Sequence, residues 1–280
     1  MRLSVLDNGH RTRTRLFLRA TSRDAPDIVR TLLYRPGFFA RPLLALTVPA
    51  MRGESYWTPA EREYLAMSMA RLNGSSFCEV THVEMVRIAG HGEVDPNDPA
   101  GERPELRAVR AFLEALHRDP GTATPPADVP EPAVRDALRV ALVWDVVNRL
   151  GNAFDFTLRP GQLESGTRAL HRFGYKFPGF LLADGPRTDG GDPVENLRHA
   201  VFDAQARTPV ELRRAAATGD GLAEPWASYA KLVREASDRI TDDDLARLVA
   251  RYSEDEVFEV TVAAAVGAAL ATYDAGTRIA

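Results

Sequence analysis

Apolar side chains recur along this chain at intervals of three and four residues, and runs that alternate apolar with polar residues are short. A period near 3.6 is typical of helices that bury one face, whereas strands have a period of two. The pattern therefore predicts an all-α fold, a multi-helix bundle, over nearly the whole chain.

The best-marked helix begins near residue 58. Thr58 is placed as its N-cap, Pro59 suits the first helical position, and Glu61 follows three residues after the cap. Together these three residues form the signature of a capping box. The helix should run to Leu72 and end at Asn73-Gly74, two residues that tolerate a left-handed turn.

Three other segments have helical periodicity. Residues 24–50 predict two short helices divided at Pro36-Gly37, because proline and glycine interrupt helices. An amphipathic helix is expected around residues 106–116, and a long, mostly buried one from about residue 132 to residue 152.

The strongest break lies at residues 184–193 (DGPRTDGGDP). It predicts a helical domain over residues 1–183 and a C-terminal helical region over residues 184–280. Residues 138–147 and 260–269 resemble each other faintly, which fits either a degenerate repeat or chance likeness between two apolar helices.

Composition limits the partners and the compartment. The 280 residues carry 35 basic and 39 acidic side chains, a formal net charge of −4, so bulk charge does not favour binding to nucleic acid. With one cysteine, Cys78, no intramolecular disulfide can form, which fits a reducing cytosol.

Residues 260–270 are the most apolar run, but 11 residues are fewer than the ~20 of a membrane span. No signal segment is evident at the N-terminus. We therefore expect a cytoplasmic protein that binds neither membrane nor nucleic acid.

The residues around the single cysteine suggest chemistry. Ser75, Cys78 and His82 are spaced so that they share one face of a helix. If this helix begins at Ser75 or Ser76, Cys78 lies in its first turn, where the free N–H groups and the helix dipole favour a thiolate. A nearby imidazolium would lower the thiol pKa further, so the spacing predicts an activated sulfur.

Glu63 belongs to the preceding helix, on the other side of the turn at Asn73-Gly74. Counting along the two helices from that turn brings Glu63 and His82 roughly level. A carboxylate there could orient His82, and His82 could in turn serve Cys78, which predicts a Glu–His–Cys relay.

Each of these residues also has an ordinary structural interpretation. A lone cysteine is often a small buried hydrophobe, His82 could be a core histidine, Glu63 a first-turn acid, and Ser75 an N-cap. Asp145 and Asn148 fit either interhelical hydrogen bonding or the lining of a pocket. An aromatic cluster is expected in the core or at a subunit interface rather than as a ligand cage. The cluster comprises Phe173, Tyr175, Phe177 and Phe180. The other histidines lack metal-ligand spacing, and glycine-rich phosphate motifs are missing from the sequence, so we expect neither metal nor cofactor.

The segment WTPAEREYLAMSMARLNGSSFCEVTH (57–82) closely resembles the active-site motif of the carboxymuconolactone decarboxylase and alkylhydroperoxidase D superfamily. That motif is E-x11-C-x2-C-x3-H, often preceded by S-R-L-N, which here is ARLN. The flanking RPGFFARPLLALT, ALRVALVWDVVNRLGNAFDF and RFGYKF look like the peroxidase-related branch, so the resemblance covers about residues 25–177. SEDEVFEVTVAAAVGAAL (253–270) also resembles helices of this superfamily, as one degenerate second unit would.

The resemblance implies an alkylhydroperoxidase D-like helical fold, assembly into homo-oligomers such as trimers or hexamers, and antioxidant reduction of hydroperoxides by a CxxC pair. Carried over by position, Cys78 would be the activated cysteine, and Glu63 and His82 the proton relay. This sequence departs from the motif at the first cysteine, which is Ser75 and cannot close a disulfide.

Three functions follow from that departure. The first, which we favour, is a one-cysteine peroxidase in which an external thiol reduces the oxidised Cys78 and Ser75 caps the helix or donates a hydrogen bond. The second is a cofactor-independent decarboxylase or lyase, in which His82 acts as acid or base on a lactone carboxylate and Cys78 is incidental. The third is a non-catalytic oligomeric scaffold or binding protein.

Overall fold

The computed structural model describes residues 1–21, 25–98, 101–183 and 190–280, and within these ranges the chain is helical, with no strand. The prediction of an all-α fold is confirmed. The helices are α1 (Val5–Asn8), α2 (Thr12–Thr21), α3 (Asp27–Tyr34), α4 (Arg41–Arg52), α5 (Pro59–Leu72), α6 (Ser76–Gly90), α7 (Pro104–Arg118), α8 (Glu131–Phe154), α9 (Gln162–Phe173), α10 (Gly179–Leu182), α11 (Pro193–Phe202), α12 (Val210–Thr218), α13 (Trp226–Glu235), α14 (Asp242–Val249) and α15 (Glu254–Ile279), with a π-helical turn η1 (Pro36–Ala40) and a 3-10 turn η3 (Ser237–Arg239).

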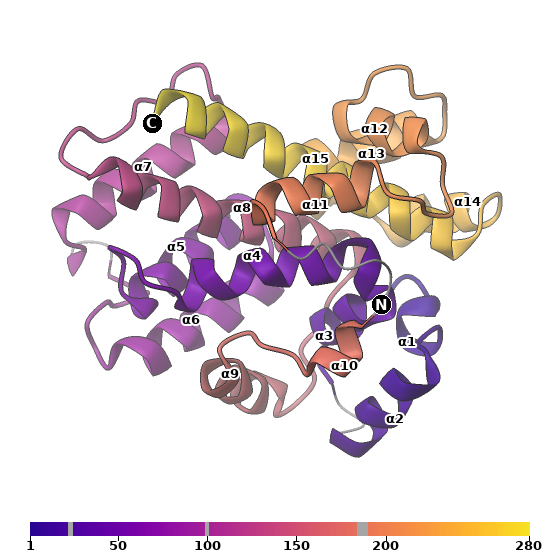
Figure 1. Ribbon diagram of the computed structural model, residues 1–280, viewed down its shortest axis with the longest axis horizontal. Helices are drawn as coiled ribbons and strands as arrows, with labels where there is room; N and C mark the ends of the chain where they lie inside the picture. The colour runs from indigo at the N-terminus through magenta and orange to yellow at the C-terminus, as the bar shows by residue number, and fades with distance from the viewer. Residues whose placement is uncertain (22–24, 99–100, 184–189) are drawn as a thin grey trace.

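Helix α8 is the central element of the bundle (Figure 1). Every residue from Val140 to Gly151 is buried, as expected of a helix that is apolar on nearly all sides. Helices α4, α5 and α15 pack around it. The long buried helix expected between residues 132 and 152 is therefore confirmed.

Helices α5 and α6 form the pair that was predicted around Asn73-Gly74. The capping box of α5 is present: Thr58 Oγ1 accepts from the Glu61 amide at 3.3 Å, and Glu61 Oε2 accepts from the Thr58 amide at 2.9 Å. The chain reverses at Gly74, which has a φ of +62° that favours glycine. The two helices then pack along each other, so residues 19 positions apart in sequence come into contact.

The segment at residues 24–50 contains two helices, α3 and α4, as predicted. The chain between them does not simply break at Pro36-Gly37, because it continues through the π-helical turn η1 into α4. Proline at the start of this turn needs no helical N–H partner, which is why it is tolerated there.

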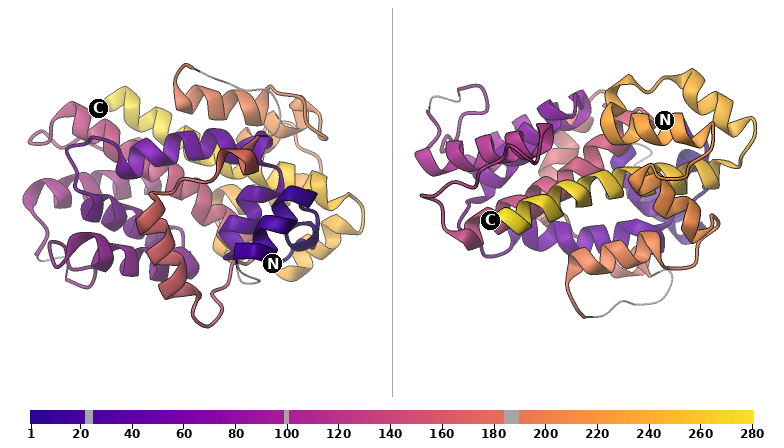
Figure 2. Two further views of the ribbon diagram at one scale, coloured as in Figure 1. Left: turned by 60° about the horizontal axis from the view of Figure 1, so that its bottom comes forward. Right: turned by 90° about the horizontal axis from the view of Figure 1, so that it is seen from above.

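The C-terminal helices join the same core as the N-terminal ones. Helix α11 packs on α4, α12 and α13 pack on α15, and α15 packs on α8 (Figures 1 and 2). One cluster of buried apolar side chains extends from Leu3 to Leu270 and so contains residues on both sides of residue 183. Of the predicted break at 184–193, residues 184–189 lie outside the described residues, and the division into two domains stays a prediction.

Helix α15 contains the apolar run at residues 260–270, which is buried as predicted. The whole helix has 26 residues, so among the described helices it is the one long and apolar enough to cross a membrane by length and composition. Of its most apolar window, 67% is buried inside the fold, and core helices of soluble proteins pass the same test. Small residues allow this burial: a Cβ at Gly267 would lie 2.4 Å from the Ala217 Cβ of α12.

Candidate active site

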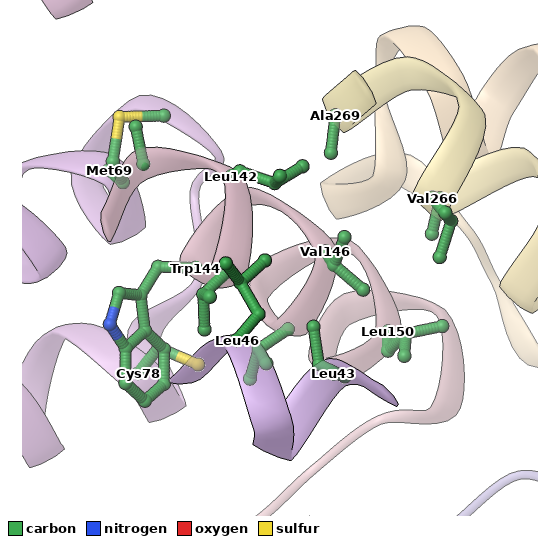
Figure 3. Close-up of a cluster of buried hydrophobic side chains, with 14 of the residues drawn as sticks. Leu43, Leu46, Met69, Cys78, Leu142, Trp144, Val146, Leu150, Val266 and Ala269 are labelled. Atoms are coloured by element: carbon green, nitrogen blue, oxygen red, sulfur yellow. The ribbon is translucent and has the colours of Figure 1, made fainter. Parts of the chain in front are cut away.

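A cavity of about 800 Å³ opens between α3, α4, α6, α8 and α9. Its size lies within the range of ~300–1,000 Å³ that small-molecule sites occupy. Cys78 and His82 of α6 belong to its wall, together with Trp144 of α8. Figure 3 shows Cys78 and Trp144 within the cluster of buried side chains, near Leu43 and Leu46 of α4. Residues of α9 line one side of this cavity, and Figure 2 shows α9 between α6 and the N-terminal helices.

Glu63 is the centre of a buried hydrogen-bond network beside this cavity. Its carboxylate is fully buried, and it accepts from Arg52 Nη2 at 2.6 Å and from the Tyr175 hydroxyl at 2.9 Å. Its second oxygen lies 2.8 Å from His82 Nδ1. The structure therefore brings Glu63 and His82 together, as the helix-pair argument predicts.

The network determines the charge of Glu63 and the positions of the protons on Tyr175 and His82. Burial alone favours the neutral acid, but the hydrogen bond and charge of His82 and the Arg52 guanidinium lower the pKa of Glu63 overall. The pKa of Tyr175 is raised well above its usual value by burial and by the Glu63 charge, so Tyr175 keeps its proton and donates it. Because a carboxylate only accepts, the Nδ1 of His82 carries the hydrogen of the shared bond.

The other ring nitrogen of His82, Nε2, is not part of this network. His82 is 1% exposed, and its Nε2 makes no hydrogen bond with any residue that the structure describes. The ring lies edge-on to the Trp144 indole, with centroids 4.0 Å apart. In the neutral imidazole this Nε2 has a lone pair, so a histidine oriented by Glu63 presents a base in the wall of the cavity.

Cys78 is the third residue of α6 and is 2% exposed. The prediction of a lowered thiol pKa is wrong here: burial raises the pKa of Cys78 to about 12, and the neighbouring Ser75 hydroxyl only partly opposes the shift. The loss of water around a thiolate outweighs what the first turn of the helix offers. The raised pKa favours the protonated thiol of Cys78 at neutral pH.

Ser75 stands at the N-cap position of α6, as one of its two interpretations predicts, but its side chain makes no capping hydrogen bond. Its hydroxyl is buried and makes no hydrogen bond within the described part of the chain. It packs near α8, where a Cβ at Gly151 would lie 3.6 Å from Ser75 Oγ. Ser75 therefore lies beside Cys78 as a buried polar group that does not cap its own helix.

The sequence gives no sign of Arg52, and it predicts Tyr175 only as one of an aromatic cluster and not as a donor to Glu63. Tyr175 follows Gly174 in a turn where both residues have positive φ, and that turn directs the ring back to Glu63. The Arg52 guanidinium lies 5.0 Å from the centre of the Tyr175 ring. The glycine after α9 signals such a turn in the sequence, but the direction of the next side chain depends on packing.

The other aromatic and polar candidates divide between the cavity and the core. Phe173, Tyr175 and Phe177 line the cavity, and Phe180 is 56% exposed. Asp145 lies outside the cavity wall and pairs with Arg149 one turn along α8, Oδ1 to Nη2 at 3.1 Å. The Asn148 amide is buried, also outside that wall, and makes no hydrogen bond with the described residues.

Comparison with known proteins adds no family to this picture. No protein-family model matches the chain, and a search of curated proteins finds no match. The resemblance to the alkylhydroperoxidase D superfamily therefore rests on the motif and its flanking segments, and the particular type of bundle stays a prediction.

Proposed function

We propose that this protein is a thiol-dependent peroxidase that reduces apolar organic hydroperoxides at Cys78, with His82 and Glu63 managing the proton. One observation supports the proposal above the others. The Glu63–His82 hydrogen bond of 2.8 Å lies beside the apolar cavity whose wall contains Cys78, and the second nitrogen of His82 makes no hydrogen bond with the described residues.

The raised pKa of Cys78 determines how the attack must proceed. With a pKa of about 12, the Cys78 thiolate is scarce at neutral pH. A base that takes the thiol proton during the attack removes this limitation, and His82 is suited to that task. Sulfur then bonds to one peroxide oxygen, the O–O bond breaks, and the leaving alkoxide takes the proton from His82. The products are an alcohol and a sulfenic acid on Cys78.

Regeneration needs an external thiol because Ser75 replaces the resolving cysteine. One thiol condenses with the sulfenic acid and releases water, leaving a mixed disulfide. A second thiol attacks that disulfide, frees Cys78 and leaves as the oxidised reductant. Assembly into homo-oligomeric trimers or hexamers and a cytoplasmic location belong to the same proposal, since both follow from the resemblance and the composition.

Consumption of cumene hydroperoxide in the presence of dithiothreitol tests this function. We expect activity in the wild type, none in Cys78→Ser, and a loss of about 10²–10⁴-fold in His82→Asn, which keeps a donor for Glu63 but has no second nitrogen. His171→Asn is the matched control, because His171 is exposed on α9 and outside the cavity wall. Full activity of Cys78→Ser would contradict the proposal.

The raised thiol pKa favours one other function, the cofactor-independent lyase. A neutral thiol leaves His82 as the reactive group of the cavity, free to remove a proton from a lactone carboxylate. Lyase activity would survive Cys78→Ser and be lost in His82→Asn. A scaffold would be indifferent to both substitutions.

A further inference from the structure

We infer that the cavity binds a long-chain carboxylate, with the apolar chain inside and the carboxylate at Lys176. This inference rests on the proposed function for its chemistry, since the bound molecule would be the carrier of the hydroperoxide group. The binding itself involves no reaction and can be measured separately.

The charge of the cavity wall selects against cations and polyols. None of the described residues that line it is an aspartate or a glutamate, and Lys176 is the one side chain with a permanent charge. The remaining wall is dominated by aliphatic and aromatic groups, such as Leu32, Leu44 and Val143. A molecule that fills this space must bury mostly hydrocarbon, and any charge on it must be negative and near Lys176.

Lys176 lies where such a head group would remain in contact with water. It is exposed, and it follows Tyr175, which is buried and held by Glu63. Phe173, another residue of the wall, is 60% exposed. Lys176 makes no ion pair with a residue in the described ranges, so its ammonium is available to a ligand. The chain has two lysines against 33 arginines, and one of the two is at this cavity.

A single ammonium matches a single carboxylate, because lysine acts as one point charge without the forked geometry that arginine offers to phosphate. The apolar wall then sets the length dependence. Each methylene moved from water into such a wall strengthens binding by about two- to fourfold. Two contributions to the affinity can therefore be measured separately. One is the contact of the carboxylate with Lys176, and the other is burial of the hydrocarbon chain in the apolar wall.

Calorimetric titration of the full chain carrying Cys78→Ser measures this binding in the absence of peroxide. The probes are decanoate, dodecanoate and tetradecanoate, with dodecan-1-ol as the uncharged partner, each below the concentration at which it aggregates. We expect affinity to rise with chain length, and dodecanoate to bind at least about fivefold more tightly than dodecan-1-ol. Lys176→Gln should remove that preference and keep the length dependence.

Lys231→Gln is the matched control, because Lys231 is the other lysine and is exposed on α13, where it pairs with Glu235. Lys231→Gln should change neither the preference for dodecanoate over dodecan-1-ol nor the dependence of affinity on chain length. Equal binding of the acid and the alcohol, no binding of either, or an unchanged preference in Lys176→Gln would overturn the inference. These outcomes are independent of the proposed peroxidase, which is tested with cumene hydroperoxide, a substrate without a carboxylate.

Discussion

At the scale of single residues, burial and neighbouring donors determine which groups of the site carry a proton. Glu63 is charged although no part of it reaches water, because three donors surround it. For Cys78, burial outweighs the opposing effect of the Ser75 hydroxyl, and the thiol keeps its proton. Burial therefore has opposite outcomes for the two groups, a carboxylate at Glu63 and a thiol at Cys78. His82 contacts Glu63 and lines the same cavity as Cys78.

Glu63→Gln should destabilise the protein by about 3 kcal/mol, because it leaves the Arg52 charge without its buried partner. The folded pKa of Glu63 is lowered, so its contribution to stability is complete above the unfolded value of ~4.3 and is lost as pH falls through the folded value. Urea unfolding of both proteins measures this, and the difference should shrink below about pH 4. Glu235→Gln, an exposed change, should cost less than about 0.5 kcal/mol. An equal cost for the two substitutions would contradict the account.

The alkylation rate of Cys78 should keep rising with pH beyond pH 10 in the folded protein. The reason is the pKa of about 12, since only the thiolate reacts with iodoacetamide. In urea the same cysteine should show the ordinary value of ~8.5, which makes the unfolded chain its own control. A plateau below pH 9 in the folded protein would show that the thiol is activated in the resting state.

At the scale of helices, two serine or threonine caps that look alike in sequence differ in the structure. Thr58 satisfies an amide at the start of α5, whereas Ser75 satisfies none at the start of α6. The local signal for a cap is the same, but the hydroxyl of Ser75 lies toward α8 and Cys78 instead of the helix end. Because the Ser75 hydroxyl does not cap α6, it can interact with Cys78 instead.

Thr58→Ala should cost about 1 kcal/mol of unfolding free energy, the usual value for a lost N-cap. Ser75→Ala should cost less than about 0.5 kcal/mol, because it removes a buried hydroxyl that has no hydrogen bond in the described chain. Thermal unfolding of the two variants gives the comparison, with Thr58→Ser as the conservative control. A larger loss for Ser75→Ala would mean that its hydroxyl has a structural partner.

At the scale of the molecule, the C-terminal helices complete the core on which the site is built. Helix α8 contributes Trp144 to the cavity, and α15 packs along α8. Residues 190–280 therefore stabilise the helix that forms one wall of the cavity without lining it themselves. The apolar face of α15 is therefore explained by its packing on α8, which in turn forms part of the cavity wall.

A shared core predicts one cooperative unfolding transition. Buried tryptophans report from both parts of the chain, Trp144 in α8 and Trp226 in α13. In two variants that each retain one of these as the sole tryptophan, with Trp57 also replaced, the fluorescence and circular dichroism curves should have the same midpoint. Separate midpoints for the two reporters would indicate that residues 1–183 and 184–280 unfold as independent domains.

The sequence predicted what depends on local signals. Periodicity identified α7 and α8, capping residues identified α5, and the turn at Asn73-Gly74 brought Glu63 level with His82. It could not predict the pKa of Cys78, which depends on every element that excludes water from the sulfur. The contacts of Arg52 and Tyr175 with Glu63 could not be predicted for the same reason: these residues lie 11 and 112 positions from Glu63 and reach it through packing and not spacing.

The most direct test of the account is trapping of a sulfenic acid on Cys78. Wild type and His82→Asn receive one equivalent of cumene hydroperoxide, dimedone captures the oxidised sulfur, and mass spectrometry follows the adduct with time. The account predicts an adduct on Cys78 in the wild type that forms at least about 100-fold more slowly in His82→Asn. A wild-type thiol that stays reduced, or one that oxidises at the same rate without His82, would contradict it.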